Sequence, residues 1–555
     1  MPRDTPVIAT PEEAAAYRAA GWWSDTTILG AVEAHARTRP EALAHTGAEE
    51  VTWAQLLASV TTLAADLARL GVVGGHRVAV WMDDGAPVHV AFLATERAGA
   101  TVVGIGARAG RREVATTMQR THPAVVITDP GRADELASVL DDLAAEHRPR
   151  VAVITGPASR PEVTAEARPR LADPPEEDPT RLGADDVFFV NTTSGTTGLP
   201  KGVVHTQNRW RYFHTQAVTN GRLTADDVFL AAVPAPFGFG LWTSHVTPLL
   251  LGATTVTVPR FSAEAAFAAI ERHRATVLCC VSTQFIMMLA SAERDRYDLS
   301  SLRVMFTGGE AVPYERAREF EEATGAATLQ FYGSNETGLL SGTTLDDPPE
   351  RRLRTAGRVV PEMQVRLFEG GRDVTDTGRG QPGCRGPATS LGYLDDDAAN
   401  RDLMTPDGWM LMGDICEIDA EGYLTVVGRT SDFIIRGGKN ISAGQVEADV
   451  ATHPAVVHVA VVAMPDPVFG ERTCAYVELV DGASLDLAGL VAHLDALGVS
   501  KELRPERLVV VDELPRSSGA KVAKGQLRAD IRRRLEAEAA AETPTTAPAH
   551  AVGAL

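Results

Sequence analysis

The chain has 555 residues, of which 44% are hydrophobic and 23% are charged, and its formal net charge at pH 7 is −20. This composition is typical of globular domains and excludes a wholly disordered, collagen-like or coiled-coil chain. A field of that sign repels nucleic acid and anionic membranes, so we expect neither as a partner, although a local basic pocket for a nucleotide phosphate is compatible with it.

The cysteines and the apolar segments indicate the cellular compartment of the protein. The five cysteines are an odd number without metal-site spacing, which favours a reducing cytoplasm over secretion. Residues 1–17 have no apolar core of the signal-peptide type. Residues 229–259 contain no Asp, Glu, Lys or Arg, but prolines and glycines interrupt them. We therefore expect buried strands and one short helix there rather than a membrane span.

Short apolar strands alternate with amphipathic helices along the first part of the chain. Strands are predicted at 77–82, 100–105 and 124–129, and helices at 51–71 and 89–100. This alternation favours mostly parallel sheets covered by helices on both faces. Residues 156–182, rich in Pro and charge, are predicted as an exposed connector before a further strand at 185–193.

The later part of the chain changes character. A second α/β run is predicted over about residues 200–330, and residues 345–430 hold short β-rich segments that indicate a small barrel or β-layer. A compact module then follows, with strands near 456–464 and 473–480 and helices near 485–497 and 525–538. Residues 541–555 are typical of a disordered tail.

The strongest chemical signal follows the strand predicted at 185–193, where residues 192–202 are TTSGTTGLPKG. Small residues let backbone N–H groups approach anionic oxygens closely, hydroxyls add donors, and Lys201 adds a positive charge. The segment is therefore predicted to cradle a phosphate. It is not a Walker A loop, because no Gly-Lys-Ser/Thr follows at the required spacing. A flexible turn rich in Ser, Thr and Gly is the alternative interpretation.

A second glycine-rich segment, residues 104–110 (GIGARAG), follows a predicted strand and looks like a dinucleotide fingerprint. Its third glycine stands one place too late, and a lone match of this kind is weak. We therefore do not expect nicotinamide binding here.

The loop at 192–202 closely resembles the signature loop of the adenylate-forming superfamily, which comprises acyl-CoA synthetases, aryl-acid AMP ligases and nonribosomal adenylation domains. Further segments resemble that family's motifs in the family's order: 331–338 (FYGSNETG), 409–414 (WMLMGD), 428–441 (GRTSDFIIRGGKNI) and 515–521 (PRSSGAK). The resemblance spans about residues 10–535. One such motif is weak, but five in register identify the chain as a member of this superfamily.

The resemblance implies a reaction and its co-substrates. A carboxylate attacks the α-phosphate of ATP to give an acyl-adenylate and pyrophosphate, and a thiol, usually of coenzyme A, then forms a thioester and releases AMP. Because anions must approach each other while negative charge builds on the phosphate, fixed cations and backbone donors must do most of the work. The resemblance also implies Mg²⁺, a hard cation that favours carboxylate oxygens.

By the same resemblance, each motif residue receives a role. Tyr332 would stack on adenine, and Asp414 would accept hydrogen bonds from both ribose hydroxyls. Glu336 would hold Mg²⁺, and Lys521, a compact point charge, would stabilise the pentavalent transition state. Lys201, Glu336 and Lys521 are thus the expected catalytic residues. The ATP and AMP site would consist of Thr193, Ser194, Gly195, Thr196, Thr197, Gly198, Lys201, Gly308, Gly309, Glu310, Phe331, Tyr332, Gly333, Ser334, Asn335, Asp414, Arg429 and Lys521.

The same comparison places the acid beside residues 237–242 and 282–285. The expected acyl pocket is Phe237, Gly238, Phe239, Trp242, Ser282 and Phe285. These segments are mostly apolar and carry no basic residue to clamp a second carboxylate, so the acid should be mostly apolar, with an aromatic or alicyclic acid as the first expectation. The alternative is that Phe237 and Phe239 are simply core residues.

Catalytic motifs fall on both sides of residue 430, which predicts the domain organisation. We expect an α/β fold with a large N-terminal body (1–430) of mostly parallel, helix-covered sheets plus a small β-layer. A small mobile C-terminal α+β domain (431–535) carries Lys521, and a disordered tail (536–555) follows. Ser431 would be the hinge, and Gly437 and Gly438 would form the loop on the coenzyme A side.

Several positions depart from the family pattern. Ala520 stands where Gly usually precedes the catalytic Lys, and a positive φ there would cost about 1 kcal/mol or more. Asn335 replaces the usual Thr but can still donate to an α-phosphate oxygen. Ser431 stands where Asp or Lys is common. Phe237 stands where many relatives have His, which puts the usual gating of the acyl site in doubt.

These departures keep rival functions open. The acceptor could be the phosphopantetheine thiol of a carrier protein or an amine, and the acid could be an unusual one such as nitrite. The chain could also be a degenerate member that binds nucleotide or acyl groups without turnover, an idea that Ala520 and Asn335 motivate.

Overall fold

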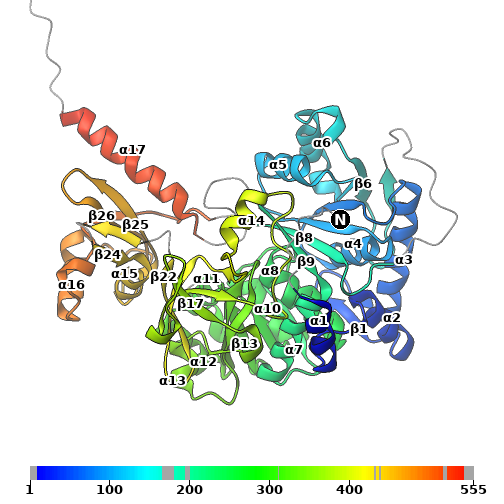
Figure 1. The fold of residues 1–555 in the computed structure, drawn as a ribbon, viewed down its shortest axis with the longest axis horizontal. Coiled ribbons are helices and arrows are strands. Elements are labelled where there is room, and N and C mark those ends of the chain that lie inside the picture. Colours follow the sequence, from blue (N-terminus) through cyan, green and yellow to red (C-terminus); the bar gives the residue numbers. More distant parts are fainter. Residues whose placement is uncertain are drawn as a thin grey trace, which may run out of the picture. The chain divides into compact units, whose positions relative to one another are not determined.

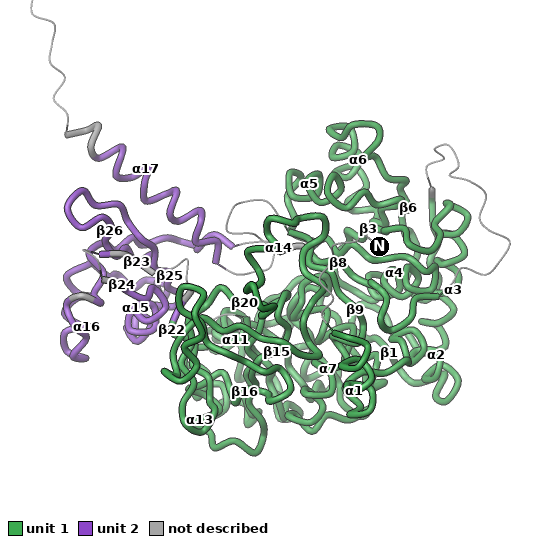
Figure 2. Tube along the Cα trace, in the orientation of Figure 1, with its two compact units in different colours: residues 1–427, 518–520 green, residues 428–517, 521–555 purple. Residues whose placement is uncertain are grey.

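The computed structural model describes residues 9–165, 181–193, 201–309, 312–429, 433–436, 439–516 and 522–542. The chain divides into two compact units (Figures 1 and 2). Unit 1 comprises residues 1–427 with 518–520, and unit 2 comprises residues 428–517 with 521–555. The prediction of mixed α/β structure with a large N-terminal sheet body and a smaller C-terminal domain is confirmed.

A seven-stranded sheet with the order β7-β6-β5-β3-β4-β8-β9 forms one layer of unit 1. Its strands are β3 (Arg77–Trp81), β4 (Thr101–Ile105), β5 (Val125–Thr128), β6 (Arg150–Ile154), β7 (Val163–Ala165), β8 (Val187–Thr193) and β9 (Lys201–Thr206). The central pairs are parallel, and β7 and β9 pair antiparallel at the two edges. β7 lies inside the segment predicted as a connector, where it extends the sheet by pairing with β6.

Helices cover this sheet as the alternating pattern predicted. They are α3 (Trp53–Arg69), α4 (Ala86–Arg97), α5 (Arg111–Thr121) and α6 (Ala133–Asp141). β4 is buried along its whole length, as expected for a central parallel strand covered on both faces.

A nine-stranded sheet with the order β16-β15-β14-β13-β12-β10-β11-β1-β2 forms a second layer of unit 1. Its strands are β1 (Leu43–Thr46), β2 (Val51–Thr52), β10 (Val228–Ala231), β11 (Thr254–Thr257), β12 (Val277–Cys279), β13 (Val304–Gly308), β14 (Ala327–Ser334), β15 (Gly338–Gly342) and β16 (Arg358–Val359). Unit 1 also contains helices α1 (Pro11–Ala19), α2 (Ile28–Thr38), α7 (Gln207–Gly221), α10 (Ala263–His273), α11 (Ser282–Ala290), α12 (Tyr314–Thr324) and α13 (Pro349–Arg354). β13 and β14 are parallel neighbours, so their carboxyl ends meet at one edge of the sheet.

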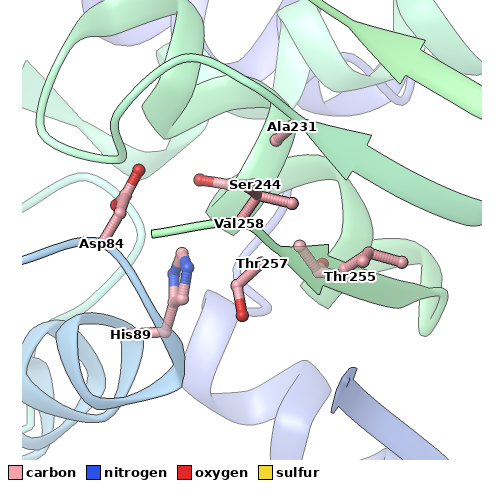
Figure 3. A pocket seen from close by; sticks show the side chains of 8 residues that line it. Asp84, His89, Ala231, Ser244, Thr255, Thr257 and Val258 are labelled. Carbon is pink, nitrogen blue, oxygen red and sulfur yellow. The ribbon is translucent and has the colours of Figure 1, made fainter. Parts of the chain in front are cut away.

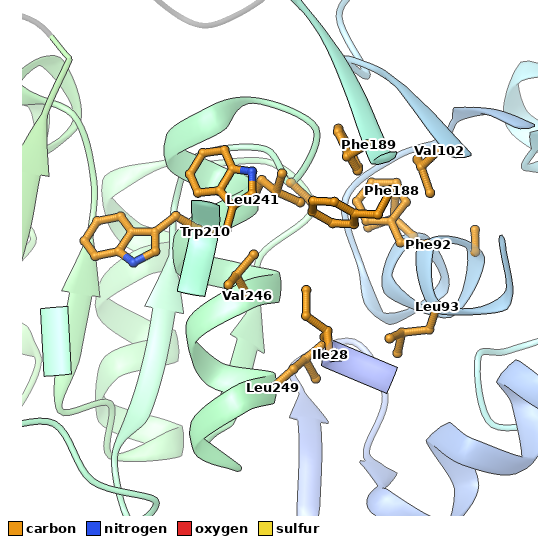
Figure 4. Close-up of a cluster of buried hydrophobic side chains, with 14 of the residues drawn as sticks. Ile28, Phe92, Leu93, Val102, Phe188, Phe189, Trp210, Leu241, Val246 and Leu249 are labelled. Carbon is orange, nitrogen blue, oxygen red and sulfur yellow. The ribbon is translucent and has the colours of Figure 1, made fainter. Parts of the chain in front are cut away.

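The uncharged stretch at 229–259 folds as buried strands and a short helical segment, as predicted. α8 (Gly238–Gly240), a π-helical turn η3 (Leu241–Val246) and α9 (Thr247–Leu251) run on from one another between β10 and β11. Among the described residues, no helix is both long and apolar enough to cross a bilayer. The side chains of Leu241, Val246 and Leu249 pack with residues from the layers of both sheets, which makes this segment part of the largest core (Figure 4).

The predicted small β-layer is a six-stranded sheet. It consists of β17 (Arg366–Glu369), β18 (Arg372–Asp373), β19 (Arg379–Cys384), β20 (Met410–Leu411), β21 (Asp414–Ile418) and β22 (Leu424–Arg429), and α14 (Asp397–Leu403) precedes β20. β21 begins at Asp414, which places this residue at the start of a strand.

Unit 2 has a five-stranded sheet with the order β24-β23-β26-β25, and β27 pairs with β26. Its elements are β23 (Phe433–Arg436), β24 (Lys439–Ser442), β25 (Val456–Asp466), β26 (Gly470–Leu479), β27 (Arg507–Val510), α15 (Ala443–Val450), α16 (Leu487–Ala496) and α17 (Lys524–Glu542). The long β25–β26 pair is antiparallel and β26–β27 is parallel, so the predicted α+β class of this part is confirmed.

Candidate active site

The segment predicted to cradle a phosphate connects the antiparallel strands β8 and β9 of the seven-stranded sheet. Thr193 pairs with Lys201 across these strands, so Lys201 stands where the segment rejoins the sheet. Of Thr193 the structure describes the backbone only, and Ser194, Gly195, Thr196, Thr197 and Gly198 lie outside the described residues. The sheet therefore fixes both ends of this segment.

Tyr393 joins Lys201 to Glu336. Lys201 Nζ lies 4.7 Å from the centroid of the Tyr393 ring, a cation–π distance. The Tyr393 hydroxyl donates to Glu336 Oε1 over 2.8 Å. Asn400 holds the backbone of Tyr393 in place: Tyr393 N donates to Asn400 Oδ1 over 2.7 Å, and Asn400 Nδ2 donates to Tyr393 O over 2.9 Å. Burial and then the charge of Glu336 raise the pKa of Tyr393, so its hydroxyl stays a donor.

Sequence reasoning missed Tyr393. It stands 57 positions after Glu336 and outside the motifs used to find the site. A tyrosine followed by a loop and a short helix carries no local signal for a contact with a distant carboxylate.

The Glu336 side chain fits a hard divalent cation. Its Oε1 accepts from Tyr393, and within the described ranges Oε2 accepts no hydrogen bond. No group of three or more His, Cys, Asp or Glu in the described part of the chain could hold a metal ion. Mg²⁺ commonly binds through one or two carboxylates and completes its shell with water and substrate phosphate oxygens, so a single carboxylate is compatible with it.

Tyr332 and Asp414, expected at the base and the ribose, lie side by side. The Tyr332 hydroxyl donates to Asp414 Oδ2 over 2.9 Å, although the residues are 82 positions apart. Cys416 Sγ lies 3.3 Å from the same hydroxyl. Burial and then the neighbouring Cys416 and Asp414 raise the pKa of Tyr332 well above its usual range. The phenol therefore keeps its proton and positions the Asp414 carboxylate.

The remaining base-side residues sit at the shared edge of β13 and β14. Gly308 ends β13 opposite Phe331, and Gly309 is exposed with φ +80°. Phe331 is only 5% exposed and packs on Trp242 with 5.0 Å between ring centroids, so its ring is in the core. Glu310 lies outside the described residues.

A tight turn at the end of β14 presents Asn335 and Glu336. Ser334 Oγ accepts from Glu336 N over 3.2 Å and from Thr337 N over 3.0 Å. Gly333 and Ser334 still belong to β14, where they pair with Leu339 and Gly338. The strand end thus presents Asn335, whose amide oxygen lies 3.1 Å from Asn191 Nδ2, and Glu336, whose carboxylate contacts Tyr393.

The residues predicted to form the acyl pocket do not all lie in the same part of the core. Phe237, Gly238 and Phe239 are half-buried, and Trp242 is buried with its ring 5.5 Å from that of Phe239. Ser282 is buried at the start of α11. Phe285 is fully buried in a separate core cluster, where its ring lies 5.7 Å from that of Phe320.

The glycine-rich segment at 104–110 packs against residues 237–242, which we call the acyl segment. A Cβ at Gly106 would lie 2.5 Å from Phe237 Cζ, and one at Gly104 would lie 2.6 Å from Phe189 Cζ. Aromatic rings therefore occupy the space that a side chain would need. Close packing explains these glycines without any ligand.

A small cavity lies beside the acyl segment, with the Asp84, His89 and Ser244 side chains around it (Figure 3). Its volume is about 10 Å³, which is room for one water molecule and not for an acid substrate. Asp84 accepts a hydrogen bond from Ala235 N over 3.1 Å, and burial raises the pKa of its carboxyl to about 6. Ala231, Thr255, Val256, Thr257 and Val258 complete the lining.

The predicted residues of the C-terminal part are mostly not described. Ser431, Gly437, Gly438 and Lys521 lie outside the described residues, and Arg429 ends β22 with only its backbone described. Their roles remain predictions.

Comparison with known proteins shows the family to which this chain belongs. The family model for AMP-binding enzyme matches residues 32–394, and that for the AMP-binding enzyme C-terminal domain matches residues 445–521. The medium-chain fatty-acid–CoA ligase of Escherichia coli (strain K12) is 31% identical over 537 residues, which covers 94% of this chain and 93% of the relative. The salicyl-AMP ligase / salicyl-S-ArCP synthetase of Mycobacterium tuberculosis is 34% identical over 532 residues, which covers 92% of each chain.

A solved structure agrees. ATP-bound MatB from Rhodopseudomonas palustris matches with a TM-score of 0.79 and 27% identity, covering 91% of this chain and 99% of that one. The motif order, the arrangement of Lys201, Tyr393, Glu336, Tyr332 and Asp414, and matches over nearly the whole length therefore agree, and the chain belongs to the adenylate-forming family of AMP-binding enzymes.

Proposed function

We propose that this protein uses ATP to activate a carboxylic acid as an acyl-adenylate and then transfers the acyl group to a thiol, with release of pyrophosphate and AMP. The observation that carries the proposal is the convergence of Lys201, Tyr393 and Glu336, which puts a cation and a carboxylate on one tyrosine where strand β9 begins. The family assignment and the named ligases among the relatives support it.

The described residues can bind and orient a nucleotide. Tyr332 offers an aromatic face, and its hydroxyl holds Asp414 as an acceptor for the ribose hydroxyls. Lys201 offers positive charge at the end of the loop that we propose for the β- and γ-phosphates. Holding ATP in this way lets an incoming carboxylate meet the α-phosphorus in one geometry, which is where most of the rate enhancement would arise.

We propose Mg²⁺ as the metal cofactor, with Glu336 as its protein ligand. When bound, the ion would supply positive charge against the phosphate oxygens. Tyr393 would orient the carboxylate by donating to Oε1 and leaving Oε2 for the ion.

We propose separate roles for three parts of the C-terminal domain (431–535). Lys521 would serve adenylation only, Gly437 and Gly438 would line the approach of the thiol, and Ser431 would be the hinge. Replacing Lys521 by Ala should abolish most acid-dependent ATP–pyrophosphate exchange and leave thioester formation from supplied acyl-adenylate largely intact. Equal loss of both partial reactions would contradict this division.

The acid is proposed to be mostly apolar, aromatic or alicyclic. The half-buried Phe239 ring lies 5.5 Å from the ring of the buried Trp242, and the half-buried Phe237 directly precedes Gly238. The relatives named above act on a medium-chain fatty acid and on salicylate, as their names state. Pyrophosphate release measured over a panel of aromatic, alicyclic, fatty and inorganic acids tests the proposal, and a preference for a charged or inorganic acid such as nitrite would refute it.

Coenzyme A is the proposed acceptor, and a carrier-protein thiol is the second candidate. The second candidate is favoured by the relative named as a salicyl-S-ArCP synthetase. The mass of the product formed with ATP, acid and either acceptor, or with an amine, decides between them. Pyrophosphate release with no acid of the panel would instead favour a binding protein without turnover.

All five cysteines are buried free thiols, which supports a reducing cytoplasm as the setting.

A further inference from the structure

A chain of buried polar side chains runs from α7 to the turn that carries Asn335 and Glu336. Arg209 is 2% exposed, and His205 and Asn191 are fully buried. Arg209 Nη1 lies 2.7 Å from His205 Nδ1, His205 Nε2 lies 2.7 Å from Asn191 Oδ1, and Asn191 Nδ2 lies 3.1 Å from Asn335 Oδ1. We call Arg209, His205 and Asn191 the relay.

The direction of every hydrogen bond in the relay follows from its first member. Arginine carries only donors, so His205 Nδ1 must accept and the ring proton must sit on Nε2. His205 Nε2 then donates to Asn191 Oδ1, which leaves the Asn191 amide nitrogen to donate to Asn335 Oδ1. The Asn335 amide is thus fixed with its oxygen toward Asn191 and its NH₂ group on the other side.

The charge states of the relay keep this pattern over a broad pH range. Burial and then the charge of Arg209 lower the pKa of His205 well below its ordinary value, so its ring stays neutral. Burial lowers the pKa of Arg209 to about 9, so the guanidinium is charged at neutral pH. Its remaining donors are held by Ala388 O at 2.6 Å, by Ser334 O at 3.2 Å and by Asn335 O. The relay therefore also anchors the backbone of the turn.

Asn335 lies beside the acyl segment. A Cβ at Gly238 would be 2.1 Å from Asn335 Oδ1 and 3.1 Å from its Cγ, so glycine at 238 lets the amide lie against that segment. Asn335 is half-buried, and within the described ranges its Nδ2 makes no hydrogen bond. The amide oxygen thus faces Asn191 and Gly238, and the amide nitrogen on the other side of the group is an uncommitted donor.

We infer that the relay holds Asn335 as an obligate hydrogen-bond donor to the reacting oxyanions, the substrate carboxylate and the α-phosphate. This inference rests on the proposed adenylation. A freely turning amide would present its oxygen to these anions part of the time, which repels them. In the relay, Arg209, His205 and Asn191 are positioning residues, and the Asn335 amide contacts the substrate.

The test replaces the buried amide of the relay by an isosteric carboxylate. In Asn191→Asp, both side-chain oxygens accept only, so the Asn335 amide must turn its NH₂ toward residue 191 and its oxygen toward the substrate. We expect kcat of acid-dependent pyrophosphate release to fall by about 10² while the KM for ATP changes much less, as for loss of one oxyanion donor.

A rescue separates this role from a merely structural one. A threonine hydroxyl rotates freely and needs no relay, so the activity of Asn335→Thr, at whatever level it lies, should not depend on residue 191. The double variant Asn191→Asp with Asn335→Thr should then match Asn335→Thr alone. A double variant that is about 10² less active than Asn335→Thr alone overturns the inference. If Asn191→Asp does not fold, Asn191→Leu serves in its place, with a smaller loss that Asn335→Thr again removes.

A measurement independent of turnover keeps the inference apart from the proposed function. The ¹⁵N shifts of His205, identified by their loss in His205→Gln, should show the neutral Nε2–H tautomer from about pH 6 to about pH 8, below the pKa of Arg209. A Nδ1–H tautomer or an imidazolium refutes the relay even in an active enzyme. Absence of acid-dependent pyrophosphate release from the unmodified chain counts against the proposed function and leaves the tautomer test in force.

Discussion

At the scale of single residues, two tyrosine hydroxyls donate hydrogen bonds to carboxylates that the sequence motifs identify. Tyr332 donates to Asp414 and Tyr393 donates to Glu336, each from a different sheet or loop than its acceptor. The motifs predicted Tyr332, Asp414 and Glu336 as site residues from sequence alone. Tyr393 and the relay could not be predicted, because their contacts join residues far apart in the chain and none of them has a characteristic spacing.

Removing the Tyr393 hydroxyl should weaken metal use. Tyr393→Phe keeps the ring under Lys201 and removes the donor that orients Glu336. A hydrogen bond to a charged group contributes about 1.5–3 kcal/mol, so we expect the Mg²⁺ concentration for half-maximal pyrophosphate release to rise about tenfold or more.

A matched control exists in the same unit. The Tyr423 hydroxyl donates to Asp347 Oδ1 over 2.6 Å, and Arg358 lies 4.7 Å from its ring centroid. Tyr423→Phe removes a similar hydroxyl outside the predicted site, so the Mg²⁺ dependence should not change. The same shift in both variants would show that it reports general destabilisation.

At the scale of elements, the site forms where strands end and a helical segment departs from regular geometry. β8 and β9 fix the ends of the 194–200 segment, and the end of β14 presents Asn335 and Glu336. The strand and helix patterns predicted these elements, because apolar periodicity is local. The π-helical turn at Leu241–Val246 was not predicted, since its register depends on tertiary contacts such as that of Gly240 with the 233–234 backbone.

Gly240 is required by that contact. A Cβ there would lie 2.0 Å from Pro234 O and 2.6 Å from Val233 O. Both are backbone atoms, so relieving the clash requires a shift of the main chain. Gly240→Ala should destabilise unit 1 by about 1–3 kcal/mol and lower the midpoint of thermal unfolding by several degrees. Gly110→Ala is the control, because no atom of the described residues lies within 4 Å of the added Cβ. Equal midpoints for the two variants would contradict this account.

At the scale of the whole molecule, a stack of buried imidazoles connects elements of both large sheets of unit 1. His45 lies on β1, His89 on α4 and His245 in the π-helical turn, with ring centroids 4.7 Å and 5.3 Å apart along the stack. All of these side chains are buried. The alternating strand and helix pattern predicted helix-covered sheets. It did not predict this histidine stack, because each histidine stands alone in an apolar segment of the sequence.

The stack should make the protein less stable in acid. Burial lowers the pKa of His45 to about 4, against about 6.5 for an unfolded chain. The unfolded state therefore binds the proton more readily, and stability is lost as the pH falls from about 6.5 to about 4. Among the residues that the structure describes, neither ring nitrogen of His45 has a hydrogen-bond partner, so His45→Leu should remove this loss without breaking a hydrogen bond.

The difference between the variant and the unmodified chain isolates this effect. Between pH 7.5 and 5.5, the free energy of unfolding of the unmodified chain should fall by ~1–2 kcal/mol more than that of His45→Leu. Asp84 acts in the opposite direction, because its raised pKa favours the folded state at lower pH, but it is present in both proteins. Parallel pH profiles would show that His45 is not the source.

The fate of the carboxylate oxygen tests the central claim most directly. The acid that gives the most pyrophosphate is labelled with ¹⁸O in its carboxylate and incubated with ATP, Mg²⁺ and coenzyme A, and the AMP formed is weighed by mass spectrometry. Attack of the carboxylate on the α-phosphorus predicts one ¹⁸O atom in AMP for each thioester formed. Unlabelled AMP, or label found in inorganic phosphate with release of ADP, would contradict adenylation by this protein.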